Sequence, residues 1–362
     1  MNKHQDLTTS HKTNRIVGLD ILRTIAILLV LVVHSTYLLE RDIRDKIEVF
    51  LPAIDGVSVF FVLSGFLIGQ IILKTLNNND LKIIDLLHFW IKRWFKTLPS
   101  YILILIILYL YEISVYKSSL NFPVYYLIFS QNFISNHPDF FPEAWSLSVE
   151  EWFYFLFPLG HFLVLYFTKQ KYLSLTVWLL LLVIIPFALR ISFYESDLLI
   201  RKIVVFRLDS MMYGILGALI QSRFTNLWQK NKIESIITSI FLVLIFEIVI
   251  RFSNTDLFEK VFKFNAESII VFLSLPYLSQ LKKVKFKFLE KVFMKISMMS
   301  YAMYLVNLSL VAWKVVPIII NQLELNQFNK ENHGLLGFYL FWVLTFLSSF
   351  LLYNYFEKPI MA

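Results

Sequence analysis

The chain consists largely of apolar runs that are long enough to cross a membrane as helices. A bilayer core about 30 Å thick needs roughly 20 mostly apolar residues for one helical span. Hydrophobic residues make up 57% of the 362 residues, and charged residues make up only 17%. A soluble domain of this size could not cover its surface with so few polar side chains. The sequence therefore predicts an all-α, polytopic membrane helix bundle.

About ten of these runs are expected to be transmembrane helices, and one further run is too short to cross. The expected spans are 15–37, 49–73, 98–116, 146–167, 172–189, 203–221, 233–250, 264–281, 298–320 and 335–356, and the short run is 122–134. The Lys- and Arg-rich loops all fall on the cytoplasmic side if the short run is a re-entrant element. Both termini are then cytoplasmic. Residues 81–96 repeat apolar side chains at helical spacing among basic ones, which predicts a cytoplasmic amphipathic helix.

The composition predicts one domain and excludes several kinds of site. We expect a single transmembrane domain over residues 1–362, with residues 1–14 as a polar cytoplasmic tail and no appended soluble domain. The net charge of +8 comes from loop Lys and Arg, so it indicates membrane orientation and no nucleic-acid binding. There is no cysteine, and the histidines lack ligand spacing, so no metal is expected.

The first span carries three ionisable residues, which are costly in a membrane unless they are paired or face a polar cavity. Asp20 and Arg23 are three residues apart and can pair along one side of a helix. Arg23 and His34 are eleven apart, which returns to nearly the same face about 16 Å along the axis. One face therefore presents an acid–base pair near its inner end and a histidine near its outer end. A structural ion pair and a histidine satisfied by neighbouring helices is the alternative.

The predicted topology sorts the remaining polar residues between the two sides. Arg93 and Lys96 lie at the inner surface, whereas Glu150 begins a span from outside and so should share a side with His34. A basic inner mouth and an outer half with His and Glu suggest a reaction between a cytosolic anionic donor and an outward-facing acceptor.

Six segments, in order, resemble the acyltransferase-3 family of integral membrane acyltransferases, which modify sugars and envelope polysaccharides. They are GLDILRTIAILLVLVVH, VSVFFVLSGFLIG, RWFKTLPSYIL, WSLSVEEWFYFLFP, ISMMSYAMYLVN and the terminal FEKP. The third departs from the family's R-x-x-R because its second position is Lys96, which keeps the charge and loses the bidentate fork. In the fifth, Asn307 stands where many members have His, so no proton transfer is expected there.

The resemblance implies a role for each candidate residue. The catalytic set would be His34, Glu150 and Arg23; the donor-binding set would be Arg93, Lys96 and Ser64; and the substrate-lining set would be Asp20, Trp145 and Tyr301. His34 would act as the base or as a covalent acyl carrier, and the sequence leaves both open.

Several of these roles also have a structural alternative. Arg23 could hold the first helix through Asp20, and Arg93 and Lys96 could be ordinary positive-inside anchors. Glu150 could simply face a helix dipole, and Tyr301 could be core packing. The neighbouring Ser64 and Gly65 are expected to pack around the donor tunnel, because Gly lets another backbone approach closely.

These residues lead to one functional hypothesis and two rivals. The first is an inner (plasma) membrane O-acyltransferase that moves an acyl group, most simply acetyl from cytosolic acetyl-CoA, to a hydroxyl of an envelope glycan or lipid-linked sugar. The transfer would be direct or through a separate extracytoplasmic acyl-accepting partner. The rivals are a transporter or flippase, which should show inverted repeats, and a binding or sensory membrane protein that has lost the chemistry.

Overall fold

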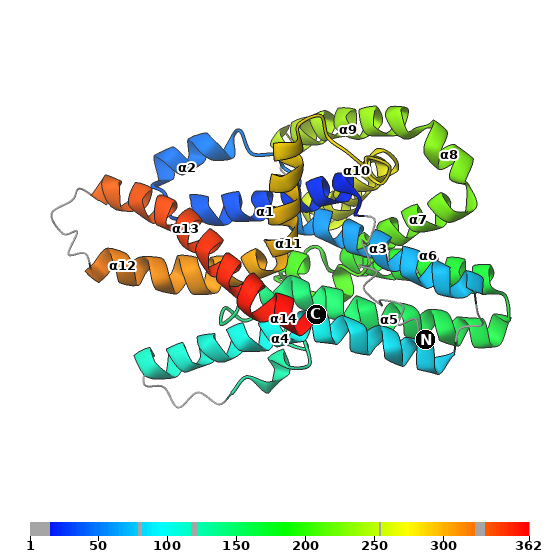
Figure 1. Ribbon diagram of the computed structural model, residues 1–362, viewed down its shortest axis with the longest axis horizontal. Helices are drawn as coiled ribbons and strands as arrows, with labels where there is room; N and C mark the ends of the chain where they lie inside the picture. Colours follow the sequence, from blue (N-terminus) through cyan, green and yellow to red (C-terminus); the bar gives the residue numbers. More distant parts are fainter. Residues whose placement is uncertain (1–14, 79–81, 117–121, 253–254, 323–329, 362) are drawn as a thin grey trace, which may run out of the picture.

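Figure 1 shows the computed structural model, which describes residues 15–78, 82–116, 122–252, 255–322 and 330–361. Over these ranges the chain forms helices and turns and no strand. The long helices are α1 (Val17–Thr36), α3 (Gly56–Asn78), α4 (Ile83–Tyr116), α5 (Ala144–Thr168), α6 (Lys171–Phe193), α7 (Asp209–Arg223), α9 (Lys232–Phe252), α10 (Lys263–Leu278), α11 (Lys287–Val306) and α13 (Lys330–Leu352).

Short elements connect or extend these helices. They are α2 (Arg41–Glu48), η1 (Val124–Tyr126), η2 (Ile200–Lys202), η3 (Val204–Phe206), α8 (Thr225–Lys230), η4 (Phe258–Phe262), η5 (Asn307–Val315), α12 (Val316–Gln322), η7 (Tyr353–Glu357) and α14 (Lys358–Met361). Within the described residues, eight helical segments are long and apolar enough to cross a membrane. The predicted polytopic helix bundle is therefore confirmed.

The other two expected spans correspond to α5 and α7. The span expected over 203–221 is wrong in its extent, because the helix starts only at Asp209 and has 15 residues. At 1.5 Å per residue it is about 22 Å long, which is shorter than a bilayer core. The preceding residues form η3, and the Asp209 carboxylate pairs with Arg190 of α6 at 2.6 Å. The charges at this point therefore join neighbouring helices.

The basic segment before residue 98 is not a separate surface helix. It is the first part of α4, which runs without a break through Pro99 for 34 residues. Several apolar side chains of this first part are exposed: Ile83, Ile84, Leu87, Ile91, Trp94 and Phe95. The boundary with the next span was predicted wrongly, because Pro99 does not end the helix. Whether the first part of α4 lies at the cytoplasmic surface stays a prediction.

The short run at 122–134 does not form a spanning helix. Its described part contains only the 3₁₀ turn η1, followed by irregular chain up to the start of α5. Phe129 there has a φ of 56°, a left-handed conformation that ordinary helices do not contain. Whether this segment enters the bilayer stays a prediction.

The closest packing in the bundle joins α3 and α7. A Cβ atom added to Gly65 of α3 would lie 1.9 Å from the carbonyl oxygen of Met211, and one added to Gly214 of α7 would lie 2.0 Å from that of Val62. Only glycine allows two backbones to come this close. The expectation that Gly65 serves close backbone approach is confirmed.

Helix α1 lies among several helices, packed against α3, α10 and α11. In Figure 1, α11 crosses α1, and the chain then turns through η5 into α12, which runs in a different direction. The turn is a π-helical segment that starts at Asn307. Such segments are uncommon and occur often at functional sites.

Candidate active site

Two cavities lie at the two ends of α1. The first, called here the Arg23 cavity, has a volume of about 550 Å³ and is lined by Arg23, Arg93, Lys96, Ser64 and Glu150 among others. The second, called here the His34 cavity, has a volume of about 910 Å³ and is lined by His34 and Trp145 among others. The helix face predicted to carry both Arg23 and His34 therefore serves two separate spaces.

Asp20 faces the Arg23 cavity but does not make the predicted pair with Arg23. Its carboxylate accepts two bonds from Arg15, at 2.7 and 2.8 Å, and one from the Ser297 hydroxyl at 2.6 Å. Arg15 reaches it in the two-point geometry typical of guanidinium–carboxylate pairs. Within the described part of the chain, no carboxylate lies within ion-pair distance of Arg23. Its charge is therefore available to the cavity.

Glu150 lies with the arginines and not with His34. Its carboxylate is 3.5 Å from the Arg93 guanidinium and accepts bonds from Tyr154 at 2.9 Å and Ser64 at 3.3 Å. Arg93 also donates to the Tyr154 hydroxyl at 2.5 Å and stacks over that ring at 4.0 Å. The prediction that Glu150 shares a side with His34 is wrong, because α5 carries Glu150 further along its length, to the level of Arg93.

The other predicted residues divide between the cavities. Tyr301 lines the Arg23 cavity and donates to the Thr97 carbonyl at 2.8 Å, whereas Trp145 lines the His34 cavity. Glu151 is buried and accepts a bond from Thr97 at 3.1 Å. Glu357 of the FEKP motif also lines the Arg23 cavity, although no role was predicted for it.

His34 is held at the edge of its cavity by one strong contact. Its Nδ1 atom lies 2.5 Å from Oδ1 of Asn307, which is fully buried at the start of η5. The sequence offered no role for Asn307 because an amide does not titrate. The sequence feature that could have pointed to Asn307 was its position in the late motif ISMMSYAMYLVN.

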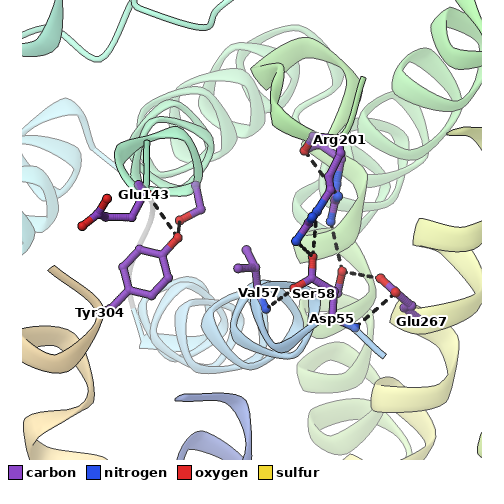
Figure 2. A network of polar contacts seen from close by, with 9 residues as sticks. Asp55, Val57, Ser58, Glu143, Arg201, Glu267 and Tyr304 are labelled. Atoms are coloured by element: carbon purple, nitrogen blue, oxygen red, sulfur yellow. Dashed lines mark hydrogen bonds and ion pairs between the residues drawn. The ribbon is translucent and has the colours of Figure 1, made fainter. Parts of the chain in front are cut away.

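A charged network, drawn in Figure 2, reaches the wall of the His34 cavity through Asp55 and Arg201. Arg201 donates to the Asp55 carboxylate at 2.9 and 3.1 Å. Ser58 donates to Glu267 at 2.5 Å and accepts from Arg207 at 3.1 Å. These residues come from three separate segments of the chain, so no local motif could have grouped them.

Glu143 stands on the opposite side of this cavity. Its carboxylate accepts bonds from the backbone N–H and the hydroxyl of Ser309 in η5. Burial raises the pKa of Glu143 to about 7, although the bonds from Ser309 favour the ionised form. This acid therefore ties the start of α5 to the π-helical segment that carries Asn307.

Val57 and Tyr304 separate the two cavities and, among the described residues, are the only ones that line both. The Tyr304 hydroxyl donates to the Glu143 carbonyl at 3.1 Å, so the Ser146 hydroxyl, 2.6 Å away, donates to the Tyr304 oxygen. Figure 2 shows Val57 between this tyrosine and the Asp55 network. The partition is thin and is held by hydrogen bonds on its tyrosine side.

The described part of the chain contains no group of three or more His, Asp or Glu placed to hold a metal ion. The arrangement instead offers a basic cavity suited to an anion and a second cavity lined by a histidine. Such a pair of sites suits transfer of a group from an anionic donor to an acceptor.

Known proteins that resemble this chain match it over only part of its length. An O-acetyltransferase OatA of Staphylococcus aureus (strain NCTC 8325 / PS 47) is 28% identical over 204 residues, which covers 51% of this chain and 32% of that protein. A second relative comes from Staphylococcus aureus (strain COL) and carries O-acetyltransferase as a provisional name. It is 30% identical over 186 residues, which cover 48% of this chain and 29% of that protein. The chain thus spans about a third of the length of these curated relatives. No solved structure shows a significant match.

The family comparison covers far more of the chain. A family model described as an acyltransferase domain matches residues 16–354. This range includes five of the six motif segments and most of the lining of both cavities, whereas FEKP lies just beyond it. The match includes His34, Arg23, Arg93 and Glu150, and it favours the enzyme hypothesis over the transporter. On this match, the chain belongs to the acyltransferase-3 family.

Proposed function

We propose that this protein is a membrane-embedded O-acyltransferase that moves an acyl group, most simply acetyl, from cytosolic acyl-CoA to a sugar hydroxyl of an envelope glycan or its lipid-linked precursor. The observation that carries the proposal is the pair of cavities at the two ends of α1, one basic and one with His34. Of the residues that the structure describes, Val57 and Tyr304 line both. The family match supports the reaction class.

The Arg23 cavity is the proposed donor site. Arg23, Arg93 and Lys96 bring three positive charges to it, and a nucleotide thioester carries several phosphate charges. The Nε atom of Arg93 is buried and has no hydrogen-bond partner among the described residues, which leaves a donor for a ligand. With this cavity facing the cytosol, both termini would be cytoplasmic in the inner (plasma) membrane.

His34 would carry the chemistry. As the acceptor hydroxyl oxygen attacks the thioester carbonyl carbon, the imidazole takes the hydroxyl proton. A C–O bond forms, the C–S bond breaks, and the proton passes from the imidazole to the departing thiolate. To reach His34, the thioester end of the donor would pass between Val57 and Tyr304, while the nucleotide stays among the arginines.

The His34 cavity is the proposed acceptor site. Its volume of about 910 Å³ is ample for a sugar unit. Asp55 and Arg201 offer hydrogen bonds to hydroxyls, and Trp145 lies on the same wall. The immediate acceptor would be either the glycan itself or a separate extracytoplasmic partner that passes the acyl group on.

A direct test uses purified protein in vesicles with labelled acetyl-CoA and an envelope-glycan fraction. Wild type should consume the thioester and label the glycan. The variant His34→Ala should lose transfer, whereas His88→Ala, which changes an exposed histidine on α4, should not. A wild type that leaves acetyl-CoA intact, or an active His34→Ala variant, would contradict the proposal.

The donor site has its own matched pair of variants. Lys96→Ala removes a charge that lines the Arg23 cavity, whereas Lys92→Ala removes an exposed charge one turn earlier on α4 that does not line it. The first should raise the KM for acetyl-CoA several-fold, and the second should leave it unchanged. Equal effects would mean that these lysines act only through the membrane surface.

A further inference from the structure

The orientation of the Asn307 amide is fixed by its neighbours. Its Nδ2 atom donates to the backbone carbonyl of Met303 at 3.0 Å and to that of Tyr304 at 2.7 Å. Carbonyl oxygens only accept hydrogen bonds, so the nitrogen of the amide must face α11. The amide oxygen must then face α1, where it meets Nδ1 of His34 at 2.5 Å.

Glu143 contacts the π-helical segment that begins with Asn307. The backbone N–H of Ser309 in η5 donates to the Glu143 carboxylate at 3.0 Å, and the Ser309 hydroxyl donates to the same carboxylate. Glu143 therefore holds η5 in place next to Asn307.

This geometry determines which nitrogen of His34 carries the proton. An amide oxygen cannot donate, so Nδ1 must supply the hydrogen of the 2.5 Å contact. In a neutral imidazole only one ring nitrogen is protonated, which leaves the lone pair on Nε2. The opposite tautomer would place two acceptors face to face.

We propose that Asn307 is a positioning residue that holds His34 in the Nδ1–H form, so that Nε2 is the nitrogen that takes the acceptor hydroxyl proton. This inference rests on the proposed acyl transfer. The proton moves from the hydroxyl to Nε2 and then to the departing thiolate, while the bond from Nδ1–H to Asn307 persists throughout. In the charged intermediate both ring nitrogens are protonated, and the amide oxygen still accepts from Nδ1.

The test compares two substitutions in the full-length protein. Asn307→Leu keeps a similar volume and removes the acceptor, so kcat should fall by about 100-fold, within the range of a base catalyst that loses its alignment. The KM for acetyl-CoA should not change, because Asn307 does not line the Arg23 cavity. In Asn307→Asp the carboxylate favours the protonated imidazole, so the acid limb of the pH–rate profile should move to higher pH.

A matched control variant and a second measurement separate a specific role of Asn307 from a general effect on the fold. Ser268→Ala removes another fully buried side chain that bonds to a helix carbonyl, at 2.7 Å in α10, and should leave kcat and the pH profile unchanged. Solid-state ¹⁵N NMR of histidine-labelled protein in bilayers reports the tautomer without any substrate. It should show the Nδ1–H form of His34 in wild type and a mixture in Asn307→Leu.

The outcomes separate this inference from the proposed function. An active wild type whose Asn307→Leu variant keeps its kcat, pH profile and tautomer would overturn the inference and leave the function intact. A wild type with no acyl transfer would overturn the proposed function, and with it the catalytic part of this inference. A protonated Nε2 in neutral wild-type His34 would overturn the structural part in either case.

Discussion

The contact between α3 and α7 gives the most quantitative prediction. In Gly65→Ala the new methyl carbon would start 1.9 Å from the Met211 carbonyl oxygen, where real contacts of this kind are not under 3.0 Å. The gap must therefore widen by at least about 1 Å, and the obstacle is backbone that cannot rotate aside. Overpacking of this kind costs about 1–3 kcal/mol, and the upper end applies here. Ala gains back about 1 kcal/mol of helix propensity. We expect a net loss near 2 kcal/mol in the free energy of unfolding.

Gly217→Ala on α7 is the control, because its methyl would meet only side-chain ends, the nearest at 3.2 Å. It should be neutral or slightly stabilising. Unfolding titrations with SDS in mixed micelles measure both variants. Equal stability of the two would refute the reasoning. Because Ser64 precedes Gly65 and bonds to Glu150, Gly65→Ala should also weaken donor binding.

Two further predictions concern buried polar groups. Arg190→Met leaves Asp209 buried without its 2.6 Å partner and should cost about 3–5 kcal/mol, and adding Asp209→Asn should restore part of this loss in the same titration. Burial lowers the pKa of His137 to about 4, so between pH 6.5 and 4 the unfolded chain binds more protons and stability falls as the pH falls. From pH 7.5 to 5 this loss should be about 2 kcal/mol. The variant His137→Phe should lack this contribution, so its stability should fall by about 2 kcal/mol less than that of wild type over the same pH range. Identical pH dependence of the two proteins would contradict the assignment.

The helix bundle could be predicted from the sequence because the bilayer requires a certain length and composition of each span. The apolar runs predicted the long helices, and the short run at 122–134 was correctly set apart. Boundaries next to charges were less accurate. Pro99 does not interrupt α4, and Asp209 starts α7 later than the apolar run suggests, because Arg190 on α6 binds that carboxylate.

The candidate site could be predicted from the sequence only in part. Arg93, Lys96 and Ser64 were predicted as one set, and all three line the Arg23 cavity, although their role stays a prediction. Arg23 was predicted in a set with His34, but the two residues line different cavities. Glu150 was assigned to the wrong cavity, because topology alone says on which side a helix begins and not how deep a residue lies along it. The links from His34 to Asn307 and from Asp55 to Arg201 join segments far apart in sequence, so no spacing rule could reveal them.

The partition of Val57 and Tyr304 also bears on how such an enzyme can exist in an energised membrane. A continuous watery path between the two cavities would let protons and ions leak, and each elementary charge that crosses 100 mV releases about 2.3 kcal/mol. Val57 and the hydrogen-bonded Tyr304, which line both cavities, would oppose such a path if they close the space between them. Under the proposed function, a neutral acyl group would pass these two side chains, whereas the phosphates of its carrier would stay among the arginines. The same two residues would thus let the cell export an acetyl group while it keeps its membrane potential.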